Sequence, residues 1–268
     1  MRICLARTAS WRLECPELAH YISRITDICG KRQDITLDLF TASNARIAMC
    51  RNMAVAHARK TGADILWFID PDMVIDRYVR RDPYGNCIGK ARPFFDQALA
   101  FLQKHMENVG PCVVAAPYVG PLPDQPLHVF SRNQKNELVR VPKDVFKEVR
   151  DWTAVEAIGT GCMMIPMQCF DLLEKTVVGK TRLAPPFFED EYTDAQQTKL
   201  RFSQDVRFCL KLRQAGVPIY CAWHCPAGHY QNCIMEVPGW PAETLRQSEK
   251  TQQPGVLVIH GEGDTCWN

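Results

Sequence analysis

Apolar and polar positions alternate along the first 120 residues in a pattern that predicts a regular succession of strands and helices. Apolar runs of strand length lie at residues 2–5, 35–40, 65–69 and 112–117. Between these runs, apolar side chains recur with the spacing of amphipathic helices at residues 18–28, 44–60 and 93–109. Because strands alternate with helices, we expect an α/β fold with a Rossmann-like, doubly wound and mostly parallel central sheet.

The second half of the chain is less regular. Residues 155–158 and 162–165 predict two strands separated by Gly159-Thr160-Gly161, and residues 205–215 predict a helix before a strand at 217–222. The polar stretch 180–203 contains two prolines and the acidic group Glu189-Asp190-Glu191, which predicts a mobile, solvated loop. We therefore expect a smaller, irregular region beside the central sheet.

The most informative stretch is Ile65–Ile69 with the two carboxylates that follow it, Asp70 and Asp72. Five consecutive apolar residues suit a strand that is buried on both faces. The aspartates should then lie at its carboxyl end, where open α/β sheets bind ligands. Two carboxylates on a short turn can hold Mg²⁺ or Mn²⁺, whose remaining ligands are commonly substrate phosphates. The alternative is an Asp-Pro turn that caps the next helix.

Bulk composition places few limits on function. The chain has 268 residues, of which 46% are apolar and 23% charged, as is ordinary for a globular protein. Its net charge of +2 is too small to indicate a nucleic-acid or membrane partner. No apolar stretch is long enough to cross a bilayer, and the first residues lack a secretory signal, so we expect a cytoplasmic protein with no membrane partner. Several of the 13 cysteines lie in apolar contexts that suit reduced core thiols, namely Cys50, Cys112, Cys162, Cys169 and Cys209.

One basic tract follows the paired aspartates. Residues 77–92 combine five cationic side chains with Tyr78 and Tyr84; the cationic residues are Arg77, Arg80, Arg81, Lys90 and Arg92. A tract of this kind is either a solvated loop or a surface that contacts a polyanion such as DNA.

Further motifs accompany Asp70 and Asp72 in a fixed order along the chain. Arg51-Asn52 precedes them, Gly159-Thr160-Gly161 and Ser203-Gln204-Asp205-Val206 come after, and His229 closes the series. This succession resembles the nucleotide-sugar glycosyltransferases of the A type (GT-A fold), especially the large inverting family that includes the processive polysaccharide synthases. The resemblance covers residues 1–235, and the ordered set is more specific than any one of its motifs.

The resemblance implies a role for each matching residue. Asp70, Asp72 and His229 would bind the Mn²⁺ or Mg²⁺ ion, which neutralises the leaving diphosphate. The donor, with a UDP-sugar as first candidate, would contact the two aspartates and four further positions, which are Arg51, Gly159, Thr160 and Gly161. Asp205 would be the catalytic base of an inverting transfer. Gln204 departs from the family pattern, in which a glutamate precedes this aspartate.

The resemblance also implies a domain organisation and an activity. Residues 1–235 would form one catalytic domain, with a nucleotide-binding half at 1–120 and an acceptor and catalytic half at 121–235, before a tail at 236–268. The enzyme would be a hexosyltransferase-type glycosyltransferase that acts on an acceptor hydroxyl of a glycan, a small molecule or, as in phage-type DNA modification, a hydroxymethylated base in DNA. A nucleotidyltransferase and a non-catalytic sugar- or DNA-binding module are the alternatives.

Each motif also has a plainer interpretation. Asp205 can be a first-turn helix residue favoured by the helix dipole, and Gly159–Gly161 an ordinary tight turn. The spacing of Cys221, His224, Cys225, His229 and Cys233 also admits a structural zinc site, although it lacks a paired Cys-x-x-Cys knuckle.

Overall fold

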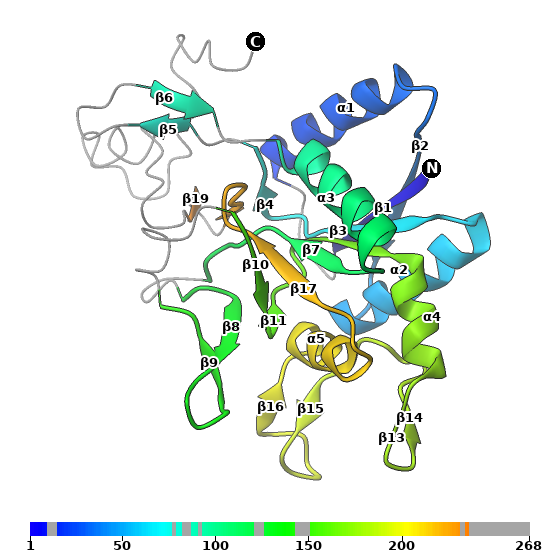
Figure 1. Ribbon diagram of the computed structural model, residues 1–268, viewed down its shortest axis with the longest axis vertical. Coiled ribbons are helices and arrows are strands. Elements are labelled where there is room, and N and C mark those ends of the chain that lie inside the picture. The colour runs from blue at the N-terminus through cyan, green and yellow to red at the C-terminus, as the bar shows by residue number, and fades with distance from the viewer. Residues whose placement is uncertain are drawn as a thin grey trace.

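The computed structural model describes residues 1–9, 15–76, 79–81, 87–90, 93–120, 126–142, 151–230 and 234–235. A seven-stranded sheet forms its centre (Figure 1), with the spatial order β10 (Trp152–Val155), β17 (Ile219–Ala222), β7 (Val113–Ala115), β12 (Cys162–Pro166), β3 (Ile65–Ile69), β1 (Arg2–Ala9) and β2 (Thr36–Ser43). Five of these strands run in one direction, and β10 and β12 run in the other. The expected α/β fold with a mostly parallel sheet is confirmed.

Helices cover both faces of the sheet, as alternate burial along β3 requires. Ile65, Trp67 and Ile69 face the apolar core beneath α1 (Pro16–Gly30) and α3 (Phe94–Asn108). Leu66 and Phe68 face the opposite core, which is covered by α2 (Ile47–Thr61), α4 (Met167–Lys175) and α5 (Gln204–Gln214). Figure 1 shows α1 and α3 on one side of the sheet and α4 and α5 on the other. A strand with no polar side chain is thus what a sheet covered on both faces needs.

The antiparallel direction of β12 departs from simple strand–helix alternation and has a local cause. The chain reaches β12 through a tight turn rather than through a crossover helix, after β11 (Ala157–Ile158) of a small sheet with β8 (Val129–Arg132) and β9 (Leu138–Arg140). Because β12 pairs antiparallel with β3, it starts at the edge where β3 ends. Cys162 therefore pairs with Ile69, and the Gly159–Gly161 turn lies beside Asp70.

Shorter elements complete the described structure. A second small sheet joins β4 (Met73–Val74), β18 (Gly228–Tyr230) and β19 (Ile234–Met235). Three hairpins are formed by β5 (Val79–Arg81) with β6 (Cys87–Lys90), β13 (Val177–Val178) with β14 (Thr181–Arg182), and β15 (Glu191–Tyr192) with β16 (Leu200–Phe202). None of the helices in the described ranges has both the length and the apolar character that a membrane crossing needs.

The stretch 180–203 is more structured than its polar sequence predicts. It contains β15 and β16, and Phe187 and Phe188 are buried in the core beneath α5. Phe188 stacks on Phe208 of α5 at a centroid distance of 4.2 Å. The cysteines that were expected to be reduced core thiols are buried and free, namely Cys50, Cys112, Cys162, Cys169 and Cys209.

Candidate functional site

Asp70 lies at the carboxyl end of β3 and is held by neighbours from two other elements. Arg51 of α2 donates from Nη2 to both carboxylate oxygens, at 3.0 and 2.8 Å, and Thr8 of β1 donates to Oδ1 at 2.9 Å. The side chain of Arg51 is only 3% exposed. Burial acts to lower the pKa of Arg51, but the charges of Asp70 and Asp205 outweigh it and raise that pKa. The guanidinium is therefore a fixed cation, and its buried Nε and Nη1 have no hydrogen-bond partner among the described residues.

Asp72, two residues later, contacts strand β18, which lies far along the chain. Strand β18 pairs antiparallel with β4, so that His229 lies opposite Met73, and the Tyr230 N–H donates to the main-chain oxygen of Asp72 at 2.6 Å. As a result Nε2 of His229 lies 3.0 Å from Oδ2 of Asp72, across 157 positions of sequence. A two-strand pairing thus brings together the second aspartate and the histidine that the sequence motifs single out.

The other ring nitrogen of His229 determines what Nε2 can do. Nδ1 lies 3.1 Å from the main-chain oxygen of Val119. A carbonyl oxygen only accepts, so Nδ1 carries a hydrogen. In a neutral ring Nε2 then presents a lone pair towards the carboxylate of Asp72. Two electron-pair donors 3.0 Å apart require a cation between them or a proton on Nε2.

The turn Gly159-Thr160-Gly161 packs against Tyr118, a residue that the motifs did not indicate. A Cβ atom on Gly159 would overlap the Tyr118 hydroxyl and lie 2.6 Å from its Cζ, and one on Gly161 would lie 2.8 Å from Cε of Met73. The Asp70 N–H donates to the Gly161 oxygen at 2.8 Å. The glycines therefore allow the turn to lie close to Tyr118 and fix its position beside Asp70. Thr160 is fully buried, and within the described part of the chain its Oγ1 has no hydrogen-bond partner.

Asp205 lies in the first turn of α5, where its charge acts on Arg51. Its Oδ1 accepts from the Val206 N–H at 2.9 Å and from the Ser203 hydroxyl. Its charge acts on the group around Asp70, because it raises the pKa of Arg51 and, after burial, that of Tyr118. Gln204, which stands where the family pattern has a glutamate, is 6% exposed, so a carboxylate there would be buried.

Tyr118 is at the centre of a group of rings that sequence reasoning missed. It stacks on His128 at a centroid distance of 5.0 Å and contacts His229 edge-to-face at 5.5 Å. Burial lowers the pKa of His128 to about 4, although the charge of Asp205 acts in the opposite direction. Tyr118 comes just after β7, as Asp70 comes just after β3. Its place at the carboxyl end of a strand is the one signal in the sequence that points to it.

The expected metal ligands do not all come together. Asp72 and His229 are neighbours, whereas Asp70 turns towards Arg51 and Thr8. Within the described ranges, a single group of three Cys, His, Asp or Glu side chains has all its ligand atoms within 4.8 Å of one another, and it is Cys4, Asp38 and His57. Cys221, His224 and Cys225 do not form such a group, and Cys233, the last residue of the alternative zinc pattern, lies outside the described residues.

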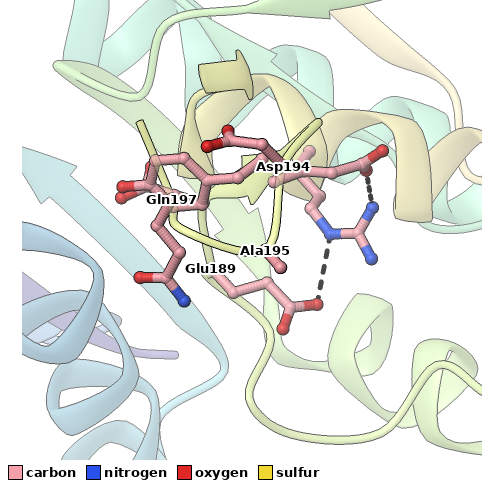
Figure 2. Close-up of a pocket in the computed structure, with 8 residues that line it drawn as sticks. Glu189, Asp194, Ala195 and Gln197 are labelled. Carbon is pink, nitrogen blue, oxygen red and sulfur yellow. Dashed lines mark hydrogen bonds and ion pairs between the residues drawn. The ribbon is translucent and has the colours of Figure 1, made fainter. Parts of the chain in front are cut away.

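A pocket of about 290 Å³ lies beside the start of α5 (Figure 2), and acidic residues between Glu189 and Asp194 line much of its wall. Arg207 pairs with both Glu189 and Glu191, and Lys211 pairs with Glu189 at 2.6 Å. Asp190 accepts from the Gln204 N–H at 2.9 Å. The carboxylates expected to be solvated are thus held by cations and by the α5 main chain.

The basic tract 77–92 is described only in part. Strands β5 and β6 pair within it, but Arg77, Tyr78, Tyr84 and Arg92 lie outside the described residues. Neither alternative for this tract, a solvated loop or a surface that contacts DNA, is therefore tested by the described side chains.

Comparison with solved structures finds a similar fold in proteins of very different sequence. The crystal structure of A197 from STIV aligns over 86% of this chain and 86% of that chain, with a TM-score of 0.51 and 16% identity. GalNAc-T7 with UDP, GalNAc and Mn²⁺ aligns over 89% of this chain and 44% of that one, with a TM-score of 0.44 and 12% identity. UDP-glucose pyrophosphorylase complexed with UDP-glucose covers 86% and 92%, with a TM-score of 0.42 and 9% identity. These likenesses are of fold. No protein-family model and no curated protein matches the sequence.

Proposed function

We propose that this protein is a divalent-metal-dependent glycosyltransferase that moves a sugar from a nucleotide-sugar to an acceptor hydroxyl. The observation that carries the proposal is the meeting of Asp72 and His229 with Nδ1 already bonded to the Val119 carbonyl. Nearby, Arg51 holds Asp70, and the field of Asp205 reaches the same residues. One carboxylate–imidazole pair, one buried cation and one further carboxylate form the set that such a transfer uses.

Asp72 and His229 suit a divalent ion of the Mn²⁺ or Mg²⁺ kind. The imidazole nitrogen is a softer ligand than the carboxylate oxygen, and its presence favours Mn²⁺ over Mg²⁺. When bound, the ion neutralises charge that develops on the leaving diphosphate. Because Arg51 and Thr8 already donate to Asp70, we assign direct ligation to Asp72 and His229 and place Asp70 on the donor side of the turn.

Arg51 and the glycine turn would bind the donor. The Nε and Nη1 groups of Arg51 are buried donors for which the described residues supply no acceptor, and a phosphate or nucleotide oxygen would satisfy them. The buried Thr160 hydroxyl, in the turn beside Asp70, likewise has no hydrogen-bond partner among the described residues. A UDP-sugar remains the first candidate donor, since the resemblance implies it.

Asp205 would take the proton of the acceptor. As the acceptor oxygen forms its bond to the anomeric carbon, the bond from that carbon to the diphosphate oxygen breaks, and the hydroxyl proton passes to the carboxylate. Both hydrogen bonds to Asp205 converge on Oδ1, so we assign the proton to Oδ2. Attack from the side opposite the diphosphate inverts the anomeric centre.

A thermal-shift screen of nucleotide sugars, with and without Mn²⁺, tests the proposal, because a bound donor raises the melting temperature by mass action. Asp205→Asn should keep the Mn²⁺-dependent shift and lose about 10²- to 10⁴-fold in transfer rate. Asp72→Asn should lose both the shift and the transfer. A matched control is Asp171→Asn on the exposed side of α4, which should change neither.

Two results would overturn this assignment. If no nucleotide sugar shifts the melting temperature in Mn²⁺, the protein is a binding module or acts on other ligands. If a nucleoside triphosphate and a sugar phosphate release pyrophosphate, the protein is a nucleotidyltransferase. Acceptor classes would be separated by offering glycans and hydroxymethylated duplex DNA with the same labelled donor, and absence of label on the DNA would discard the DNA acceptor.

A further inference from the structure

A second group of chemically reactive side chains lies on β1, β2 and α2. The parallel pairing of β1 with β2 places Cys4 opposite Asp38. Helix α2 covers the same face of the sheet and brings His57 above the two strands. As a result the Cys4 thiol, an Asp38 oxygen and a His57 ring nitrogen all lie within 4.8 Å of one another.

The three groups are oriented as well as close. Nε2 of His57 lies 2.8 Å from Oδ2 of Asp38. Phe40, two positions after Asp38 on the same strand, stacks on the imidazole with a centroid distance of 4.3 Å and an interplanar angle of 18°. Cys4 is fully buried, whereas the side chains of His57 and Asp38 are 28% and 29% exposed. The thiol thus forms the floor of a site that the other two groups leave open to solvent.

We propose that Cys4, Asp38 and His57 form a Zn²⁺ site with three protein ligands and an open fourth position for water. A thiolate, an imidazole and a carboxylate are the three ligand types that zinc uses in proteins. Bond lengths of 2.0–2.3 Å in a tetrahedral site set ligand atoms about 3.3–3.6 Å apart, which small side-chain movements reach from the present positions. Mg²⁺ is a poor occupant, because it avoids thiolate.

Without metal, the thiol is held in its protonated form. Burial raises the pKa of Cys4 to about 12, and the charge of Asp38 adds to the increase. Binding of Zn²⁺ therefore forms the sulfur–zinc bond and releases the thiol proton to solvent. The metal would also replace the hydrogen between Nε2 of His57 and Asp38. Nδ1 of His57 would then carry the ring hydrogen.

This site is separate from the proposed catalytic one. Cys4 precedes Thr8, the neighbour of Asp70, by four positions on β1, which is roughly 13 Å along a strand. The inference therefore holds whichever activity the protein proves to have.

The test uses the full chain, stripped of metal and kept reduced with a non-thiol reductant. Addition of Co²⁺ should produce thiolate-to-cobalt absorption that saturates at one equivalent, and Zn²⁺ should displace it. Cys4→Ala should abolish this absorption, and His57→Gln should weaken binding at least about tenfold. Cys112→Ala, another buried thiol with a pKa near 12, and His105→Gln should bind as the natural sequence does.

The partly exposed position of His57 keeps the test decisive if Cys4→Ala fails to fold. Absorption that persists unchanged in Cys4→Ala, or unchanged affinity in folded His57→Gln, would overturn the site, as would an absence of absorption in the natural sequence. In Asp72→Asn the cobalt absorption should be retained, which distinguishes failure of this site from failure of the proposed transferase.

Discussion

Carboxylates gather at two places in this molecule, the turn after β3 and the pocket beside α5, and their partners differ. In the pocket, Glu189 and Glu191 are paired with the permanent cations Arg207 and Lys211. At the turn, Asp70 has a comparable partner in Arg51, but Asp72 faces an imidazole whose Nδ1 hydrogen is bonded to a carbonyl. Carboxylates that pair with protein cations hold the fold together, whereas a carboxylate and an imidazole side by side offer two ligand types that a divalent cation can bind.

Removal of Arg51 should have the largest effect on stability and tests this comparison most directly. Arg51→Gln leaves Asp70, which is 18% exposed, without its buried cation, and we expect the free energy of unfolding to fall by about 3 kcal/mol in urea titrations. Arg59→Gln is the matched control on the same helix, because Arg59 and its partner Glu174 are each about one-third exposed. It should cost under about 1 kcal/mol. Equal losses in the two variants would contradict the contrast between buried and exposed pairs.

Asp76 sharpens the comparison, because it is a buried carboxylate whose side chain accepts a hydrogen bond from a main-chain N–H. Its Oδ1 accepts from the Phe94 N–H at 2.7 Å, and burial raises its pKa to about 6. The folded state therefore binds this proton more tightly than the unfolded chain, so the stabilisation is complete below about pH 4 and is lost as the pH rises through 6.

Asp76→Asn should remove that loss, because the amide keeps the acceptor oxygen without the charge. We expect the free energy of unfolding at pH 7 to rise by up to about 3 kcal/mol, with variant and natural sequence converging near pH 4. Urea titrations from pH 4 to 8 measure the difference. A difference independent of pH would show that Asp76 does not titrate in this range.

Gly159→Ala tests the tight packing around Tyr118. The added methyl group would overlap that ring, so we expect a loss of about 2 kcal/mol in the free energy of unfolding. Gly30→Ala is the control, because a Cβ atom at Gly30 has no neighbour within 4 Å. If both variants unfold at the same urea concentration, the turn is looser than the contacts indicate.

The smallest effect should come from the pocket. Glu191→Gln removes ion pairs with Arg201 and Arg207, whose side chains are 58% and 34% exposed. Solvent screens such pairs, so we expect a change of less than about 1 kcal/mol. A loss above about 2 kcal/mol would place Glu191 with Asp70 as a carboxylate on which stability depends.

Local sequence patterns predicted the elements that are buried on both faces. The apolar run at 65–69 matches β3 residue for residue, since only a sheet covered on both sides accommodates five such side chains. The helices at 47–61 and 94–108 followed from their apolar spacing. The position of Asp70 and Asp72 at the strand end followed from the same pattern.

What the sequence did not reveal depends on contacts between distant segments. The direction of β12 depends on its antiparallel pairing with β3 and β7, which apolar runs do not encode. Tyr118 carries no motif, and its role depends on the close approach of the Gly159–Gly161 turn. Residues 189–191 appeared solvated in the sequence because the partners Arg207 and Lys211 lie further along the chain, on α5. The domain limits and the roles of the individual site residues remain predictions.

The pairing of β4 with β18 has a consequence for the order in which the molecule assembles. Strands β1, β2 and β3 are near neighbours in sequence, so this part of the sheet can form early, whereas closing the loop from Asp72 to His229 must wait for most of the chain. A nascent or truncated polypeptide that ends before His229 would thus contain all seven strands of the central sheet but not the histidine that lies beside Asp72. Under the proposed function, the order of synthesis would therefore complete the metal-binding pair only after the scaffold around it.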